Sequence, residues 1–285
     1  MQDRTKVIIL GGGPGSIFAY YGALAADYDM DEVQIWANGL TYPPGAFWIH
    51  QLPQNCEVAF EPTRINVHLA GIAEEYSRKQ WGVSYPTSAA TYCGKSYNAY
   101  NPHVVLPTLW DLCNTKKVDL KWDIHSVMDL AERYEFVIVT FPITVEALSA
   151  FGKLKVPVFH SPIPYEKDKP DNYCLYNGME NIDWVRVTKI FGNISVEYPH
   201  TMASQLDYIM EQEHLVWGDL AAKGKVSLVP EMHPTTQPIK ERIIGRNRNV
   251  LLTGRWATLN RKALSHDSWN DVYDFITDEG EIPYD

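Results

Sequence analysis

The sequence lacks a hydrophobic run long enough to cross a membrane, although 45% of its 285 residues are hydrophobic. A transmembrane helix needs about 20 consecutive apolar residues. The first residues, MQDRTKV, are charged and lead directly into a short apolar run, so a signal peptide is not expected either. We therefore predict a cytoplasmic globular protein, without a membrane partner, that is long enough to bury a sizeable core.

Cysteine is scarce and its spacing is uninformative. The sequence has no Cys-x-x-Cys pair, and its four cysteines are far apart: Cys56, Cys93, Cys113 and Cys174. This predicts free thiols in a reducing compartment and offers no ligand set for a metal. The sequence also lacks a recognisable Ser-His-Asp or Cys-His combination, which argues against catalysis by a side-chain nucleophile.

Positive charge is also in deficit, because the formal net charge is -10. Contacts with a phosphate backbone need a positive surface, so nucleic-acid binding is not favoured. One basic cluster leaves the alternative of a nucleic-acid-linked substrate open, although a solvated loop is the simpler interpretation: Lys240, Arg242, Arg246 and Arg248. Nothing in the sequence indicates an oligomeric state.

The start of the chain, in contrast, carries a strong pattern. A short apolar run at residues 6–10 is followed by the turn GGGPG, an apolar helix-like segment at residues 16–26 and a second apolar run at residues 32–36. This order predicts strand, tight turn, helix and strand. Apolar strands that alternate with helices are typical of a parallel sheet covered on both faces. The sequence thus predicts an α/β fold with a Rossmann-type domain.

The turn matches the dinucleotide-binding fingerprint Gly-x-Gly-x-x-Gly, with serine in the third glycine position. Gly11 permits the tight turn and Gly13 lets the backbone approach a pyrophosphate, whereas Ser16 is small enough for the helix to pack on the strand. Pro14 and Gly15 complete the turn. The free N–H groups and the positive dipole end of the helix suit an anion, so this segment is predicted to bind a nucleotide.

One part of the fingerprint is absent. An acidic residue is expected at the end of the second strand, where it would hold the ribose hydroxyls. The sequence there reads Trp36-Ala37-Asn38, without a carboxylate. The amide of Asn38 is the candidate for this hydrogen bond, and it is a weaker acceptor than a charged group.

Periodicity predicts further elements along the chain. Helices are expected at residues 64–81, near 108–113, at 204–222 and at 269–276, and strands at 118–122, 136–140 and 249–253. Residues 85–107 are rich in Pro, Tyr and Asn and are predicted to be irregular. Residues 185–198 alternate around Gly192 and Asn193, which predicts a β-hairpin.

A second motif lies near the C-terminus. The segment from Val250 to Thr258 reads VLLTGRWAT and places Gly254, Arg255 and Trp256 after an apolar strand. Together with the glycine turn, it resembles the flavoprotein group that includes amine oxidases, protoporphyrinogen oxidase and UDP-galactopyranose mutase. The resemblance implies FAD as the cofactor, with the late Gly-Arg pair closing on its phosphates and ribityl chain. An arginine guanidinium is a forked cation suited to phosphate.

Three further segments resemble UDP-galactopyranose mutase specifically, in the same order as in that family. They are Glu75-Tyr-Ser-Arg-Lys-Gln-Trp-Gly82, the apolar stretch from Tyr134 to Ile143, and Glu197-Tyr-Pro199. The chain departs from that family because it is shorter and has no arginine-rich stretch after Trp81 for a sugar-nucleotide diphosphate. The resemblance therefore implies the shared fold and the flavin, and it leaves the galactofuranose chemistry open.

The predicted organisation is a Rossmann-type FAD-binding domain with a smaller, discontinuous α+β substrate domain. We assign residues 1–63, 118–160 and 240–285 to the first and residues 64–117 and 161–239 to the second. After the second strand, this flavoprotein group runs its chain along the flavin ring, and here that segment is Gly45-Ala46-Phe47-Trp48-Ile49-His50. His50 is a candidate catalytic base, and Arg186 is a candidate for holding an anionic substrate.

These features favour an FAD-dependent oxidoreductase of the amine-oxidase type, which takes a hydride from a C–N or C–H bond of a small-molecule or nucleic-acid-linked substrate. Three alternatives stay open. One is an isomerase like UDP-galactopyranose mutase, which uses reduced flavin, and another is a flavoenzyme that modifies nucleobases in a phage. The third is a nucleotide sensor without catalytic activity.

Overall fold

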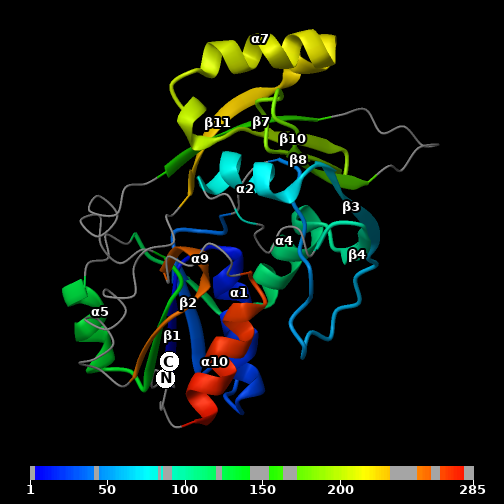
Figure 1. Cartoon of the computed structure of the whole chain (residues 1–285). Coiled ribbons are helices and arrows are strands. Elements are labelled where there is room, and N and C mark those ends of the chain that lie inside the picture. The colour runs from blue at the N-terminus through cyan, green and yellow to red at the C-terminus, as the bar shows by residue number, and fades with distance from the viewer. Residues whose placement is uncertain are drawn as a thin grey trace.

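The computed structural model describes residues 4–41, 45–82, 85, 92–119, 124–141, 154–162, 172–231, 249–257 and 264–278. For a few of these it gives the backbone alone: Trp81, Leu154, Lys155, Pro230, Glu231, Arg255 and Trp256. Two β-sheets organise the chain, one in the lower half of Figure 1 and one in the upper half.

The first sheet is parallel and has five strands in the order β12-β6-β1-β2-β5. The strands are β1 (Val7–Leu10), β2 (Val33–Ala37), β5 (Thr115–Lys117), β6 (Phe136–Val139) and β12 (Val250–Leu252). All of them except β5 are largely buried, as expected for central strands that helices cover on both faces.

Helices cover both faces of this sheet. Val7 and Ile9 face a core formed with α1 (Pro14–Ala25), α4 (Pro102–Leu112) and α10 (Asp267–Thr277). Ile8 and Leu10 point to the opposite face, where they meet α5 (Ile124–Ala131). Figure 1 shows α1 and α10 side by side along the sheet. The predicted α/β fold of Rossmann type is therefore confirmed.

The second sheet is mixed and has seven strands in the order β11-β7-β10-β9-β8-β3-β4. They are β3 (Thr63–Gly71), β4 (Lys95–Ala99), β7 (Leu154–Pro162), β8 (Tyr173–Gly178), β9 (Arg186–Ile190), β10 (Asn193–Glu197) and β11 (Lys225–Glu231). β9 and β10 form the predicted hairpin around Gly192 and Asn193. Strands β7, β8 and β11 were not predicted.

Two helices cover opposite faces of the second sheet. Val187 and Val196 pack beneath α7 (Leu206–Trp217), which continues as the 3-10 helix η2 (Gly218–Lys223). The other face turns toward the first sheet, and α2 (Ala73–Trp81) lies over part of it, where Tyr76 meets Tyr176 of β8 at 5.0 Å between ring centroids. This inward face is the one that can meet a ligand held by the first sheet.

The predicted helix at residues 64–81 is wrong in its first half. Residues 63–71 form β3, and only residues 73–81 are helical. In β3, Ile65 and Val67 are buried while Arg64 and Asn66 are exposed, so the true period is two. Gly71, with a φ of 76°, ends the strand against the backbone of Gly178.

The predictions for residues 85–122 also need correction. The stretch expected to be irregular contains β4 and most of α4, which begins six residues before the predicted helix. Asn101 caps α4 by accepting a hydrogen bond from the His103 N–H at 3.0 Å, and Pro102 follows at the first helical position, which is a typical helix start. The strand expected at 118–122 is β5, at residues 115–117, and residues 120–123 lie outside the described ranges.

Two strands belong to the sheet of one predicted domain although their residues were wholly or partly assigned to the other. β5 belongs to the parallel sheet although it lies within residues 64–117, and β7 belongs to the second sheet although it begins within residues 118–160. Apart from Thr63, the first residue of β3, each other described strand lies in the sheet of its predicted domain. The division into two domains itself stays a prediction.

Candidate functional site

The glycine turn forms as predicted between β1 and α1. The Gly11 N–H donates to the Trp36 carbonyl at 3.1 Å, and the φ of Gly11 is 129°, a conformation that favours glycine. A Cβ atom on Gly11 would collide with Thr140 Oγ1, which follows β6. The turn is also tied to the segment after β2, because the Thr41 N–H donates to the Gly12 carbonyl at 2.7 Å.

Ser16 occupies the third position of the fingerprint without disturbing it. Its side chain is fully buried, and its Oγ lies 2.7 Å from Thr140 Oγ1, whose hydroxyl in turn donates to the Leu10 carbonyl at 3.0 Å. The serine hydroxyl is thus satisfied by the end of β6. Helix α1 can pack on the sheet as it would with glycine at this position.

The start of α1 offers backbone N–H groups without a competing side chain. Its N-cap is Gly13, which has no side-chain acceptor, and Pro14 and Gly15 follow. The first turn contains no acidic residue, so the positive end of the helix dipole is not neutralised there. Such a helix start suits a phosphate or another anion.

The C-terminal part of the chain reaches the same place. β12 pairs with β6, and the Thr253 N–H donates to the Val139 carbonyl at 3.0 Å, which brings α9 (Gly254–Ala257) to the carboxyl edge of the sheet. A Cβ atom on Gly254 would lie 3.3 Å from Ser268 Oγ, and one on Gly15 would lie 3.2 Å from the same oxygen. The two motifs therefore converge on one hydroxyl group.

Ser268 was not predicted as a site residue. It is fully buried, and its Oγ has no hydrogen-bond partner among the residues that the structure describes. A buried hydroxyl without a partner is costly, so a ligand oxygen at this point would satisfy it. The signal in the sequence is the short polar run His266-Asp267-Ser268 before an apolar helix, which is typical of a helix start.

Of the other residues predicted to contact the cofactor, some are described by the structure and others are not. Asn38 follows β2 and is exposed at the same edge of the sheet. Thr258 and the side chains of Arg255 and Trp256 lie outside the described residues, as does the basic cluster between residues 240 and 248. Their predicted roles stay predictions.

The segment at residues 45–50 lies against the inward face of the second sheet. Gly45 has a φ of 102°, and a Cβ atom there would collide with Ser195 Oγ of β10. The Ala46 N–H donates to the same oxygen at 2.7 Å, and Ile49 forms a β-bridge with Tyr100. The close approach that requires glycine in the structure is therefore to β10, whereas the sequence suggested an approach to the flavin ring.

The aromatic residues of this segment meet two histidines. The Trp48 and His50 ring centroids are 5.1 Å apart, and the His50 ring lies 6.5 Å from that of His266. Phe47 contacts His103 of α4 at 5.8 Å. His266 immediately precedes α10, and the glycine motifs converge at the start of that helix. Through its contact with His266, His50 therefore lies between the second sheet and this point.

His160 of β7 also lies beside Gly45 and was not predicted as a site residue. A Cβ atom on Gly45 would lie 3.2 Å from His160 Cβ. The His160 Nε2 is 2.9 Å from Ser227 Oγ, and burial, with a smaller effect of Lys225, lowers the pKa of His160. A neutral imidazole at this place can accept a proton.

Arg186 carries an internal counter-charge. It lies directly opposite Glu197 in the hairpin, and its Nε donates to Glu197 Oε1 at 2.9 Å. Burial lowers the pKa of Arg186, but the attraction of Glu197 together with that of Tyr176, Cys174 and Tyr76 outweighs it, and the pKa is raised well above its ordinary value. The guanidinium also lies 5.9 Å from the Tyr176 ring centroid. These contacts anchor Arg186 in the sheet, and its role toward a substrate stays a prediction.

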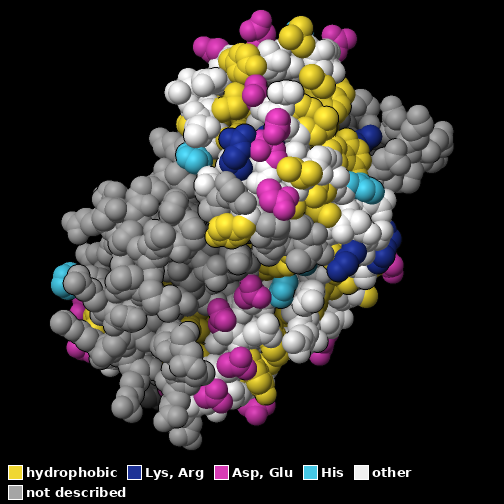
Figure 2. All heavy atoms as spheres, in the orientation of Figure 1, with side chains coloured by type: hydrophobic (Ala, Val, Ile, Leu, Met, Phe, Trp, Pro, Cys, Tyr) yellow, Lys and Arg dark blue, Asp and Glu magenta, His cyan; other side chains and the backbone are white. Residues whose placement is uncertain are grey.

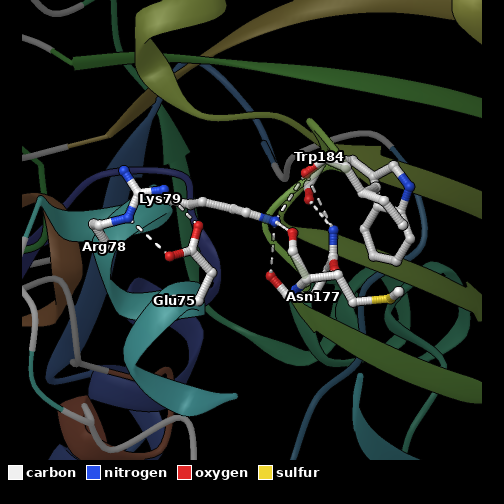
Figure 3. A network of polar contacts seen from close by, with 7 residues as sticks. Glu75, Arg78, Lys79, Asn177 and Trp184 are labelled. Atoms are coloured by element: carbon white, nitrogen blue, oxygen red, sulfur yellow. Dashed lines mark hydrogen bonds and ion pairs between the residues drawn. The ribbon is translucent and has the colours of Figure 1, made fainter. Parts of the chain in front are cut away.

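The segment that resembles UDP-galactopyranose mutase, residues 75–82, forms α2. Arg78 makes a bidentate pair with Glu75, at 2.8 Å from Nε and 2.6 Å from Nη2. Lys79 Nζ donates to three carbonyls at the end of β8 and in the turn after it, those of Asn177 at 3.4 Å, Ile182 at 2.8 Å and Met179 (Figure 3). Arg78 is thus paired within α2, whereas Lys79 ties this helix to the end of β8 and the turn after it.

Charge and hydrophobicity give little further indication of a partner. Acidic side chains are scattered over the described part of the surface in Figure 2, and no broad basic patch is visible among the coloured residues. No helix within the described ranges is both long and apolar enough to span a bilayer. The same ranges contain no group of three or more His, Cys, Asp and Glu residues placed to hold a metal ion.

A Rossmann-type parallel sheet combined with a second mixed sheet is the fold of several known flavoenzymes. No protein-family model and no curated protein matches the chain. The crystal structure of reduced UDP-galactopyranose mutase is similar, with a TM-score of 0.55 and 8% identity, over 95% of this chain and 93% of the mutase. CtdE in complex with FAD and a substrate gives a TM-score of 0.50 and 13% identity, over 95% and 79% of the two chains.

A triple mutant of a flavin-dependent brominase is also similar, with a TM-score of 0.51 and 8% identity, over 97% of this chain and 80% of the brominase. At such low identities these similarities establish the fold. The common fold extends over both sheets, because nearly the whole chain is covered in each comparison.

Proposed function

We propose that the chain is an FAD-dependent enzyme, and that the diphosphate of FAD binds at the start of α1. The observation that carries this proposal is the convergence of Gly15 and Gly254 on the buried, unpartnered hydroxyl of Ser268. The N-terminal turn would supply backbone N–H groups, and Ser268 would donate a hydrogen bond to a phosphate oxygen. The guanidinium of Arg255 is the proposed cation on the opposite side.

The fold supports FAD over NAD. The similar structures include flavin enzymes of different activities, and they share both sheets with this chain. A second sheet whose inward face lies near the carboxyl edge of the Rossmann sheet suits a long cofactor with a ring system that extends beyond the diphosphate. Ligands of open α/β sheets bind at this edge.

Bound FAD would supply the redox chemistry by accepting a hydride from a C–N or C–H bond and passing the electrons to oxygen or another acceptor. The chain's own residues would bind and orient the substrate. Phe47 and Trp48 would exclude water from it. His50 is the proposed proton acceptor, and His160 is a second candidate because it adjoins the same segment.

An oxidoreductase is favoured over a mutase on the evidence of the arginines. A sugar-nucleotide diphosphate needs cations, and three candidate arginines among the described residues already have acceptors. Arg64 donates to Asn98 Oδ1 at 2.9 Å, Arg78 pairs with Glu75, and Arg186 pairs with Glu197. The mutase remains the second candidate because its reduced form has the same fold over 93% of its length. Conversion of UDP-galactopyranose only after dithionite reduction would favour the mutase.

The direct test is to denature the purified protein and identify the released small molecule by mass spectrometry. We expect FAD, and before denaturation an absorbance spectrum with bands in the blue and near ultraviolet. Release of a nicotinamide dinucleotide, or failure to bind added FAD, would contradict the proposal.

A variant at the N-cap tests where FAD binds. Gly13 has an ordinary φ of -87°, and the nearest atom to an added Cβ would be Thr41 O at 4.0 Å, so a side chain fits. Aspartate is a favourable N-cap residue, so Gly13→Asp should fold with unchanged or higher stability. Its carboxylate would repel the diphosphate, and we expect loss of FAD binding. Gly13→Asn is the uncharged control and should lose less affinity.

A further inference from the structure

Two buried hydrogen-bond donors without partners flank the histidine pair of the site. Within the described ranges, four buried side-chain atoms have no hydrogen-bond partner, and two of them are Trp48 Nε1 and Ser268 Oγ. Trp48 lies two residues before His50, and Ser268 lies two residues after His266. The contact between His50 and His266, at 6.5 Å between ring centroids, joins the two segments, so each segment carries one unpartnered donor.

The two donors differ in what they adjoin. Ser268 Oγ lies beside Gly15 and Gly254, at the proposed diphosphate site. Trp48, in contrast, packs on the inward face of the second sheet, against a cluster that includes Ile65, Val67 and Cys174. Trp48 and Ser268 therefore lie in different surroundings, and a ligand beside the Trp48 and His50 rings would satisfy the indole N–H.

The chemistry of these side chains selects the ligand. An indole N–H can only donate, and an imidazole donates from one nitrogen when neutral and from both when protonated. Asp267 Oδ1 lies 3.6 Å from His266 Nε2, close enough to pair with that ring when it is protonated. Several donors around one ring pair match a group with more than one acceptor oxygen, and a carboxylate or a phosphate has this property.

We propose that Trp48, His50 and His266 form a binding site for an oxyanion, which is a carboxylate or phosphate group of the substrate. The site itself is independent of the cofactor, but calling its ligand the substrate rests on the proposed function. The anionic group of the substrate would be recognised by this cluster and not by Arg186, because Glu197 already neutralises the charge of Arg186. The substrate is then an acid that is oxidised at a carbon near its anionic group.

The test follows the indole resonance of Trp48 in ¹H–¹⁵N NMR spectra of the full-length protein, assigned by triple-resonance methods. Sodium acetate, inorganic phosphate and neutral acetamide are titrated separately. We expect a saturable shift with acetate or with phosphate, and the more effective of these two identifies the group. Acetamide should give no saturable shift, because it lacks the charge and the second oxygen.

Variants of the two histidines test the site without altering Trp48. His50→Asn and His266→Asn should each weaken binding of the effective anion about tenfold, the usual effect of losing one hydrogen bond to a charged group. His125→Asn is the matched control, because His125 is exposed on α5. Thermal melting of each variant checks that it is folded.

The outcomes separate this inference from the proposed function. A saturable anion response at Trp48 in a protein that binds no FAD would support the oxyanion site and contradict the flavoenzyme. FAD binding without any saturable response at Trp48 would overturn the oxyanion site alone. An equal response to acetamide, or undiminished anion binding by both histidine variants, would also overturn it.

Discussion

The hydroxyl of Ser268 lies 3.2 Å from the position that a Cβ atom on Gly15 would occupy. This relationship joins the first helix of the chain to the last, and the packing of α10 along α1 fixes it. A Cβ atom on Gly22, two turns further along α1, would lie 2.6 Å from the Trp269 carbonyl oxygen. The close approach of the two helices therefore holds Ser268 at the start of α1.

Replacing Ser268 with alanine should have opposite effects on stability and on binding. Ser268→Ala removes a buried hydroxyl without a partner, so the free energy of unfolding without FAD should rise by about 1 kcal/mol. The same change removes a donor to the phosphate, and FAD affinity should fall about tenfold. Thermal unfolding with and without added FAD measures both effects. An unchanged FAD-dependent increase in Tm would show that Ser268 does not contact the cofactor.

Alanine variants of two glycines at the nucleotide-binding edge distinguish the stability cost of backbone strain from that of steric overlap. Gly11 and Gly39 have φ values of 129° and 144°, which an alanine adopts at a cost of about 1–3 kcal/mol. A Cβ atom on Gly39 would meet no atom within 4 Å, whereas one on Gly11 would collide with Thr140. Gly11→Ala should therefore lower the free energy of unfolding by about 2 kcal/mol more than Gly39→Ala. Urea denaturation compares the two, and equal losses would argue against the overlap.

The sequence allowed the first βαβ unit to be predicted because local and global signals agree there. The apolar runs of β1 and β2 are buried strands, and the turn between them needs glycine for both conformation and space. β3 was misread because Ile65 and Leu69 fit a helical stripe as well as an alternating strand. The positive φ of Gly71, which ends the strand, cannot be read from the sequence.

Long-range contacts explain what else escaped prediction. β3 pairs in parallel with β8, more than a hundred residues later, and β7 lies between β10 and β11. No local pattern encodes such neighbours. In the site, the glycine turn and Gly254 were recognised from motifs. The place of Ser268 depends on the register of α10 against α1, and that of Ser195 beside Gly45 depends on the order of strands in the second sheet.

Neighbouring cations of α2 should contribute very differently to stability. Lys79 Nζ is partly buried and holds carbonyls at the end of β8 and in the turn after it, and burial lowers its pKa (Figure 3). Lys79→Met would leave these carbonyls without their donor and should cost about 1–3 kcal/mol. Arg78→Met removes an exposed guanidinium from the buried carboxylate of Glu75 and should cost about 1 kcal/mol. Similar losses in chemical denaturation would contradict a special role for Lys79.

The buried carboxyl group of Glu213 should make stability depend on pH. Glu213 lies on the buried side of α7, where Tyr198 donates to one carboxyl oxygen and the other has no partner among the described residues. Burial raises the pKa of Glu213 and outweighs hydrogen bonding by Tyr198 and Trp217, which lowers it. The unfolded state loses this proton near pH 4.3, whereas the folded state keeps it to higher pH, so stability should fall as the pH rises through this window.

Glu213→Gln should flatten the decrease and be more stable than the original protein above the window. Glu211→Gln, an exposed change on the same helix, should leave it unaltered, and an identical pH profile for both variants would refute the assignment to Glu213.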